Sequence, residues 1–351
     1  MEDKTIRTLI LTQDDILKAG CFDIGMAVET ARDAVLSYAA GRILYPDKVS
    51  QVFDEITQNR TNCLPATLLD ESVSGMKWVS VFPANAVRFG LQNLSAVILL
   101  SSTVNGFPLT FMEGTLISNM RTAAVSALAA EKLAKANAET VGFVGAGEQA
   151  KYHFLALKKV RPSIKKCYVS SRTSATEQRF IACLAPLYED VEFIPCDSDY
   201  QKAVSNADIL VSAISGQAPI IRAEWIKRGA FYSHVAGWED DYKVPLMADK
   251  IVCDNWNSVK HRTQTISRLY KMGRLTDKDI YCDLDKLLTG QLPGRESDKE
   301  FIYFNAVGLS FVDVALADRV YNICRAKGLG LEVVMQNTDP FTALKEGVGK
   351  C

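Results

Sequence analysis

The sequence has no long hydrophobic run, almost no net charge and no apolar leader. No apolar stretch approaches the roughly 20 residues that cross a bilayer, and Met1-Glu-Asp-Lys4 lacks the apolar core of a signal peptide. The 40 basic and 41 acidic side chains leave a net charge of -1, which gives no reason to expect binding to nucleic acid or to a membrane surface. We therefore expect a cytoplasmic protein.

Metal-ligating residues are also scarce and scattered. The three histidines, His153, His234 and His261, lie far apart in the sequence. The nine cysteines are an odd number and include no Cys-x-x-Cys pair. We predict no metal site, and we expect reduced, mostly buried thiols.

A glycine-rich turn is the most informative feature that the sequence does contain. Thr140-Val-Gly-Phe-Val144 predicts a short buried strand, Gly145-x-Gly147 a tight turn, and the residues from Ala150 onward a helix. Such a turn directs backbone N–H groups and the positive end of a helix dipole at one point, where a pyrophosphate binds. The predicted dinucleotide contacts are Gly145, Ala146, Gly147, Glu148 and Gln149.

Several further apolar runs follow the glycine turn and alternate with helical stretches. This alternation predicts a doubly wound parallel sheet of the Rossmann type. Ala213 directly follows one of these strands, Val235 is the last residue of another, and both are expected to line the cofactor. The predicted strands are 166–170, 207–212, 230–235 and 250–254.

The end of the second strand of this sheet bears on the choice of dinucleotide. An acidic residue there would bind the ribose 2′-hydroxyl of NAD, whereas this chain has Ser171, Arg172 and Thr173. Two hydroxyls beside a guanidinium suit a 2′-phosphate, so we favour NADP(H), with NAD(H) as the alternative. In the competing interpretation, Arg172 is a solvated residue at a helix start or stacks on the adenine.

An alanine-rich segment from Arg121 to Ala130 predicts a tightly packed helix ahead of the glycine turn. Arg121 stands at the start of this expected helix, where a cation is unfavourable to the helix dipole. The guanidinium therefore either points to solvent or meets an anion.

Several motifs together, in a fixed order from about residue 40 to residue 335, resemble one known family. They are Gly75-Met-Lys-Trp78, Gly106-Phe-Pro-Leu109, Met120-Arg-Thr-Ala-Ala124, Val144-Gly-Ala-Gly-Glu-Gln149, Ala207-Asp-Ile-Leu-Val211 and Asn305-x-x-Gly308-x-x-x-x-Asp313. The chain resembles the ornithine cyclodeaminase and mu-crystallin family. Members of that family include amino-acid dehydrogenases, ketimine reductases, an opine-type dehydrogenase and cyclodeaminases.

The resemblance implies chemistry at the α-carbon of an amino acid or its imine, with cations that bind the substrate carboxylate. By similarity these cations are Lys48, Lys77 and Arg121. Lys48 stands where many members carry arginine, which weakens bidentate recognition. Lys77 has a second possible role, because partial desolvation beside Arg121 would lower its pKa and let it handle a proton. Otherwise Lys77 is a structural surface lysine on a strand.

The family also carries an acidic residue after the fifth Rossmann strand. In this chain Trp238 occupies the place of that acid, and the carboxylates Glu239, Asp240 and Asp241 follow. By resemblance we expect Glu239, or else Asp240, to be the acid–base group or the anchor of the substrate amino group. In the alternative interpretation, these carboxylates have no catalytic role and form the tip of an acidic loop. The departure argues against assuming that the substrate is ornithine.

The resemblance also suggests the organisation of the chain. We expect an α+β substrate-binding and dimerisation domain from residues 1–120 with 310–351, and an NAD(P)-binding domain from 121–309. Asn305 and Gly308 fit a loop near the nicotinamide, and the glycine allows close backbone approach. The implied assembly is a homodimer joined through the first domain.

The leading hypothesis is an NAD(P)-dependent oxidoreductase that acts on the CH–NH or CH–NH2 group of an α-amino acid or its imine. The alternative within enzymes is a cyclodeaminase that recycles its hydride and expels ammonia. A third possibility is a non-catalytic, cofactor-dependent binding protein of the crystallin type.

Overall fold

The computed structural model describes residues 5–54, 56–214, 216, 218–337 and 339–345, which form two compact units. The first unit contains the described parts of 1–22, 43–116 and 317–351. The second contains 23–42 and the described parts of 117–316. The boundaries fall within two long helices, α4 (Thr115–Leu133) and α12 (Ser310–Ala326), and on either side of α2 (Ile24–Ala39).

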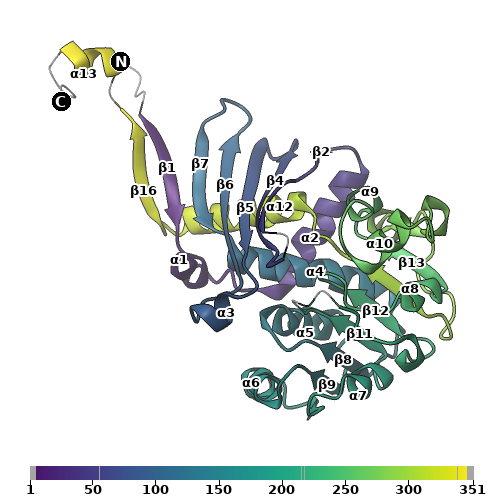
Figure 1. Ribbon diagram of the computed structural model, residues 1–351. Helices are drawn as coiled ribbons and strands as arrows, with labels where there is room; N and C mark the ends of the chain where they lie inside the picture. Colours follow the sequence, from purple (N-terminus) through teal and green to yellow (C-terminus); the bar gives the residue numbers. More distant parts are fainter. Residues whose placement is uncertain (1–4, 55, 215, 217, 338, 346–351) are drawn as a thin grey trace. The chain divides into compact units, whose positions relative to one another are not determined.

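The first unit is built on a largely antiparallel sheet in the order β16-β1-β7-β6-β5-β4-β2, with β3 paired to β4 (Figure 1). Only β1 and β7 within this order run parallel. The strands are β1 (Ile6–Leu11), β2 (Ile43–Leu44), β3 (Val49–Asp54), β4 (Asn59–Leu68), β5 (Val73–Val81), β6 (Leu94–Ser102), β7 (Pro108–Glu113) and β16 (Leu331–Gln336). The short helices are α1 (Gln13–Lys18), α3 (Asn85–Arg88) and α13 (Pro340–Lys345).

Burial alternates along the central strands of this sheet, as expected when one face packs on a core. On β6 the buried residues are Ala96, Ile98 and Leu100. On β5 the corresponding positions include Val79 and, unusually, Lys77, which pairs in register with Ile98. The register therefore directs a lysine toward the apolar side of the sheet.

The second unit is built on a parallel sheet in the order β10-β9-β8-β11-β12-β15-β13-β14. Its strands are β8 (Thr140–Val144), β9 (Lys166–Ser170), β10 (Glu192–Pro195), β11 (Ile209–Ser212), β12 (Phe231–His234), β13 (Lys250–Cys253), β14 (Cys282–Asp283) and β15 (Ile302–Asn305). Its remaining helices are α5 (Glu148–Val160), α6 (Ser174–Leu184), α7 (Tyr200–Ser205), α8 (Lys243–Leu246), α9 (Trp256–Val259), α10 (Thr265–Lys271) and α11 (Leu284–Leu288), with 3-10 turns at Ala185–Leu187, Ala223–Trp225 and Asp277–Asp279.

This parallel sheet confirms the predicted doubly wound fold. The strands β11, β12, β13 and β15 are buried along their whole length, which explains why their sequences are short and mostly apolar. The strand order reverses between β8 and β11. In such sheets ligands bind at this point, beyond the carboxyl ends of the strands.

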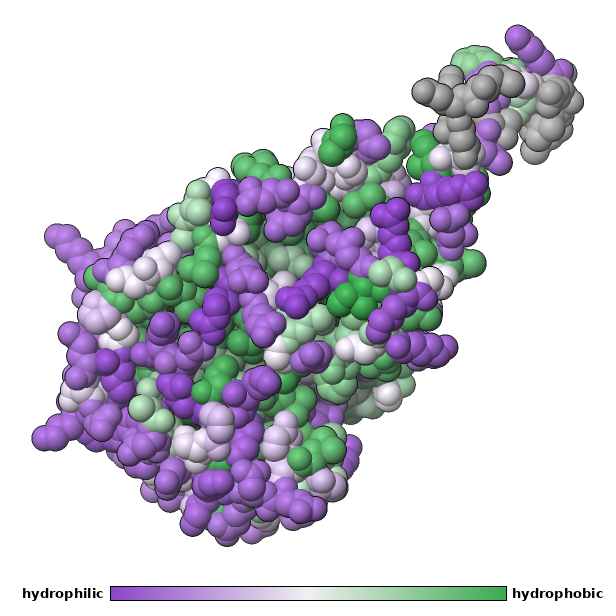
Figure 2. All heavy atoms as spheres, turned by 180° about the vertical axis from the view of Figure 1, so that it is seen from behind, coloured by the Kyte–Doolittle hydropathy of each residue, from purple (hydrophilic) through white to green (hydrophobic). Residues whose placement is uncertain are grey.

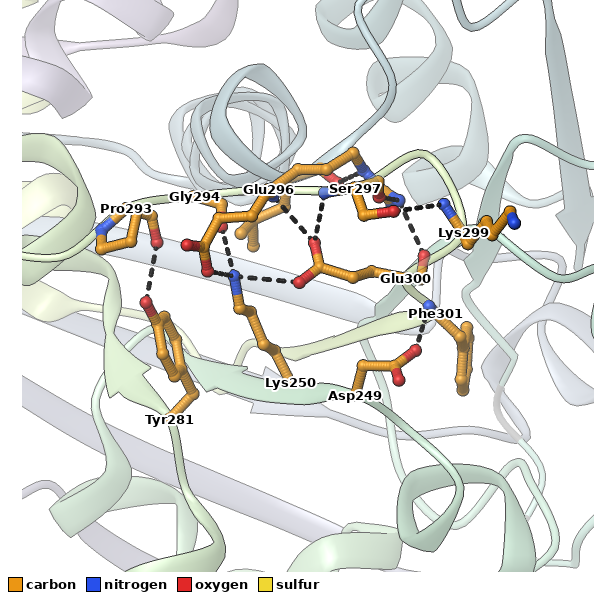
Figure 3. Close-up of polar contacts among 12 residues, drawn as sticks. Asp249, Lys250, Tyr281, Pro293, Gly294, Glu296, Ser297, Lys299, Glu300 and Phe301 are labelled. Atoms are coloured by element: carbon orange, nitrogen blue, oxygen red, sulfur yellow. Dashed lines mark hydrogen bonds and ion pairs between the residues drawn. The ribbon is translucent and has the colours of Figure 1, made fainter.

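The connector between α11 and β15 is held by one buried lysine (Figure 3). Lys250 is 7% exposed, and its Nζ donates to Gly294 O at 2.7 Å and to Glu296 Oε2 at 2.6 Å. Glu300 Oε1 lies 3.2 Å from the same nitrogen, and the Tyr281 ring lies beneath it. These contacts fix the position of a long segment that forms no helix or strand of its own.

Hydrophilic and apolar side chains are mixed on the face shown in Figure 2. On the sheet of the first unit, several apolar side chains are at least two-fifths exposed: Val49, Val52, Phe53, Trp78, Phe111, Leu331, Val334 and Met335. Among the described residues, no helix has the length and apolar character needed to cross a membrane.

Candidate functional site

The glycine turn between β8 and α5 has the geometry of an anion cradle. Gly145 has φ +104°, and a Cβ there would lie 2.5 Å from the carbonyl oxygen of Ala213, so only glycine fits. Gly147 is the N-cap of α5, no side chain caps it, and a Cβ there would meet open space. The first amide groups of α5 are therefore open to a pyrophosphate, and these residues fit a dinucleotide.

The candidate ribose-binding residues lie at the end of β9. Ser171 is buried, and its hydroxyl donates to Thr173 O at 2.9 Å. Thr173 is the N-cap of α6, and the side chain of Arg172 between them is exposed. The three residues thus form one short turn in which Arg172 extends outward to where a ligand could meet it.

Glu177 of α6 organises this turn, although sequence reasoning missed it. Its carboxylate is fully buried and accepts four backbone N–H groups. Oε1 accepts from Ser171 at 2.8 Å and Ser198 at 2.9 Å, and Oε2 accepts from Cys196 at 3.1 Å and Asp197 at 2.9 Å. Asp197 and Ser198 have φ of 54° and 67°, a left-handed conformation that residues other than glycine adopt infrequently. Glu177 therefore joins the loops that follow β9 and β10.

The other predicted cofactor contacts lie in or beside the second unit's sheet. Ala213, Val235 and Asn305 stand at the carboxyl ends of β11, β12 and β15, which are neighbours in the sheet. Asn305 is fully buried, and its side-chain amide has no hydrogen-bond partner among the described residues. An orphaned amide at this edge fits a polar ligand such as a carboxamide. Gln149 Nε2 instead donates to Asn119 Oδ1 at 2.5 Å.

Arg121 is buried and held in a fixed orientation. Its Nε donates to Asp313 Oδ1 at 2.8 Å, and an Nη lies 3.4 Å from the Ser118 hydroxyl. A Cβ on Gly308 would lie 2.7 Å from Nη1, so the guanidinium packs directly on the backbone of that glycine. Arg121 is only 7% exposed, so its guanidinium does not point to solvent, which was one of the two expectations from the sequence.

The helix that carries Arg121 starts earlier than predicted. α4 begins at Thr115, whose N–H donates to Glu113 Oε1 at 2.5 Å, while the N–H of Leu116 donates to Oε2 of the same carboxylate at 3.1 Å. Arg121 therefore lies in the second turn of α4, beyond the first amides, and the expectation that it stands at the helix start was wrong. The acidic cap that begins the helix precedes its alanine-rich part.

The two predicted lysines belong to the first unit. Lys77 is 1% exposed and lies on the buried face of β5, so it is not a surface lysine. Lys48 is half-buried and directly precedes β3. Their predicted roles in carboxylate binding rest on the family resemblance and stay predictions.

The carboxylates after β12 lie inside the second unit. Glu239 is fully buried, accepts from Ser212 Oγ at 2.5 Å and from Ile214 N at 2.7 Å, and is not part of an acidic loop tip. Asp240, also fully buried, accepts from the Thr265 hydroxyl. Either carboxylate would have to leave these partners to reach a substrate, and their acid–base role stays a prediction.

His234 of β12 completes this buried cluster. Its Nε2 lies 3.4 Å from Asp240 Oδ1 and 3.6 Å from Glu239 Oε2. Burial alone would lower the pKa of His234, but the two carboxylates outweigh burial and raise it. Burial raises the pKa of Glu239, and His234 opposes that rise. No sequence signal marked His234, because a lone histidine on an apolar strand has no distinguishing pattern.

The loop around these carboxylates is fixed by aromatic contacts. Trp238, which takes the place of the family's acid, stacks on Tyr242 at 5.6 Å between ring centroids, and the Arg268 guanidinium lies 4.5 Å from the Trp238 ring. The third carboxylate, Asp241, is half-buried and accepts from the Lys243 N–H.

Known proteins are similar to this chain over nearly its whole length. An N-((2S)-2-amino-2-carboxyethyl)-L-glutamate dehydrogenase of Staphylococcus aureus is 28% identical over 326 residues, which cover 92% of this chain and 97% of that protein. The structure of Thermococcus litoralis Delta(1)-pyrroline-2-carboxylate reductase, in complex with NADH and L-proline, is 27% identical with a TM-score of 0.88 and covers 93% of this chain and 100% of that one.

An archaeal alanine dehydrogenase, solved as a dimer with bound NAD, is 29% identical with a TM-score of 0.85 and covers 94% of this chain and 100% of that one. These homologues are amino-acid and imine dehydrogenases or reductases. The profile of the ornithine cyclodeaminase/mu-crystallin family matches residues 7–328. The glycine cradle, the buried Arg121 and this match agree, and the chain belongs to the ornithine cyclodeaminase/mu-crystallin family.

Proposed function

We propose that this protein is an NAD(P)-dependent oxidoreductase that interconverts an α-amino acid and its imine. The observation that carries the proposal is the buried guanidinium of Arg121. It is oriented by Asp313 and Gly308, in the same unit as the open N-terminus of α5. When bound, the nicotinamide dinucleotide supplies or accepts the hydride at the α-carbon.

In this proposal Arg121 anchors the substrate carboxylate. Nε donates to Asp313, so the two terminal amino groups, one of which lies 3.4 Å from the Ser118 hydroxyl, would bind a substrate carboxylate in the forked geometry that arginine favours. The α-carbon next to a fixed carboxylate is then held in one orientation. We propose Lys48 and Lys77 as further cations for the substrate, with Glu239 or Asp240 as the acid–base group.

Turnover with a panel of amino acids tests this function. We expect incubation with one of them and NADP⁺ or NAD⁺ to raise the near-ultraviolet absorbance of reduced cofactor, and Arg121→Ala to abolish the rise. Arg32→Ala is the matched control, because Arg32 lies on α2 and pairs with Glu131 at the surface. Ammonia release without net reduction would instead identify a cyclodeaminase. Absence of any turnover across the panel would favour a binding protein.

For the cofactor we propose a preference for NADP(H) over NAD(H). Arg172 is exposed between Ser171 and Thr173, where a 2′-phosphate would meet a guanidinium and two hydroxyls. Fluorescence titration with NADPH and NADH tests this preference. We expect tighter NADPH binding that is lost in Arg172→Ala and kept in Arg179→Ala, which changes an exposed arginine on α6, the helix that follows Arg172. Equal affinity for the two cofactors would contradict the proposal.

For the assembly we propose a cytoplasmic homodimer joined through the sheet of the first unit. The apolar side chains exposed on that sheet would gain stability if a second copy covered them. The double variant Trp78→Glu, Phe111→Glu is expected to turn a dimer into a monomer in light scattering. A monomeric wild-type protein would refute the proposed dimer.

A further inference from the structure

A buried carboxyl group at the end of β13 takes no part in the chemistry described so far. Asp254 is 4% exposed. Its Oδ2 accepts from Val307 N at 2.9 Å and from Gly308 N at 2.8 Å, while Oδ1 accepts from Asn255 N at 2.8 Å. The backbone N–H of Asp254 donates to Asn305 O at 3.1 Å. Asp254 therefore holds both ends of the loop 305–308 that leaves β15.

This loop is the surface on which Arg121 rests. Because a Cβ on Gly308 would lie 2.7 Å from Arg121 Nη1, any displacement of the Gly308 backbone moves into or away from the guanidinium. Gly308 also has φ +93°, a conformation that glycine adopts readily and a residue with a Cβ would not, so the backbone can come this close to the guanidinium only at a glycine. Asp313 orients Arg121 through Nε, and the loop held by Asp254 bounds the terminal amino groups.

We propose that Asp254 is a positioning residue for Arg121: by holding the N–H groups of Val307 and Gly308, it sets the orientation in which Arg121 presents its guanidinium to the substrate carboxylate. This inference rests on the proposed carboxylate-binding role of Arg121. Asp254 itself does not touch the substrate in this scheme.

The pKa of Asp254 makes this role sensitive to pH. Burial raises the pKa of Asp254 to about 6, although the N–H groups of Gly308, Val307 and Asn255 and the charge of Arg121 oppose the rise. The other titratable groups that interact with it are Asp283 and the Cys253 thiol. Once protonated, the carboxyl group has one acceptor fewer for its three backbone donors, so acid loosens the loop beneath Arg121.

Two variants of Asp254 and one matched control test the proposal. Asp254→Ala removes all three acceptor contacts, and Asp254→Asn keeps one acceptor oxygen and cannot ionise. Asp283→Asn is the control, because Asp283 is a neighbouring half-buried carboxyl whose pKa desolvation likewise raises to about 6, and it accepts from Trp256 N instead of the loop.

The first measurement is hydrogen exchange of the Val307 and Gly308 amides, which requires no substrate. We expect exchange to be roughly tenfold faster or more in Asp254→Ala, partly restored in Asp254→Asn, and unchanged in Asp283→Asn. The second is calorimetric binding of L-alanine, as a carboxylate probe, to the cofactor-loaded enzyme. We expect Asp254→Ala to weaken probe binding roughly tenfold. We also expect wild-type binding to weaken on the acid side of pH 6, and binding by Asp254→Asn to show no such pH dependence.

The outcomes separate this inference from the proposed function. Unchanged exchange in Asp254→Ala, or faster exchange with unchanged probe binding, would overturn the positioning role. Probe binding that depends on Arg121 without any turnover by the wild-type protein would count against the oxidoreductase and leave the positioning role supported. Loss of probe binding in Asp283→Asn as large as in Asp254→Ala would show a general effect of charge and refute the inference.

Discussion

Replacement of Glu177 by glutamine is expected to destabilise the second unit strongly. Each carboxylate oxygen of Glu177 accepts two backbone N–H groups. A glutamine must turn its NH2 group toward one of these two pairs, so two buried donors lose their acceptor. At about 1–3 kcal/mol for each unsatisfied group, Glu177→Gln is expected to lower the free energy of unfolding by about 2–6 kcal/mol.

Urea unfolding of the variant and a matched control measures this difference. Glu192→Gln removes a carboxylate of the neighbouring strand β10, where Glu192 is exposed and lies 3.5 Å from Lys166. Its loss is expected to cost less than about 1 kcal/mol, as for other exposed pairs. If Glu177→Gln unfolds within 1 kcal/mol of wild type, the four hydrogen bonds do not hold the loops as argued. Hydrogen exchange at Asp197 and Ser198 would then also be unchanged.

Three further perturbations have outcomes that the structure determines. Gly308→Ala places a Cβ 2.7 Å from Arg121 Nη1, so we expect a raised KM for the amino acid and a lower melting temperature; unchanged kinetics would show that the guanidinium is free to move. Lys250→Met leaves the Gly294 carbonyl without its donor and removes the ion pair with the largely buried Glu300, and equilibrium unfolding should show a loss of about 1–3 kcal/mol. Because burial raises the folded-state pKa of Asp283 to about 6, the folded state holds its proton longer, and stability falls as pH rises from about 4 to 6. Asp283→Asn should make that fall shallower in urea titrations at several pH values, and an identical slope would refute the assignment.

The parallel sheet could be predicted because its signals are local. The strands β9 and β13, whose central residues are apolar, were found within one residue of their bounds, because strands of a parallel sheet covered on both faces have little polar alternation. The glycine turn was equally readable, because Gly145 needs a positive φ and an absent Cβ. The start of α4 was missed, because its cap is the carboxylate of Glu113, two residues before the helix and outside the alanine-rich run.

The supporting residues of the site could not be predicted in this way. Asp254 and Glu177 act by accepting backbone N–H groups from loops 53 and 19 residues away, and a backbone donor leaves no mark in the sequence. Likewise, the partner of Arg121 is Asp313, 192 residues along the chain. Such pairs are set by strand order, which brings the ends of β13 and β15 together.

The sequence by itself determined the family, the dinucleotide turn and the parallel sheet, because each depends on residue types at short, fixed spacing. The tertiary structure decided which charges are buried and what they bind. Arg121 and Lys77 became buried cations, and Glu239 and Asp240 became internal carboxylates beside His234. The physical reason is that burial and pairing of a charge depend on the packing of distant segments, and the cost of an unpaired buried charge appears only when those segments meet.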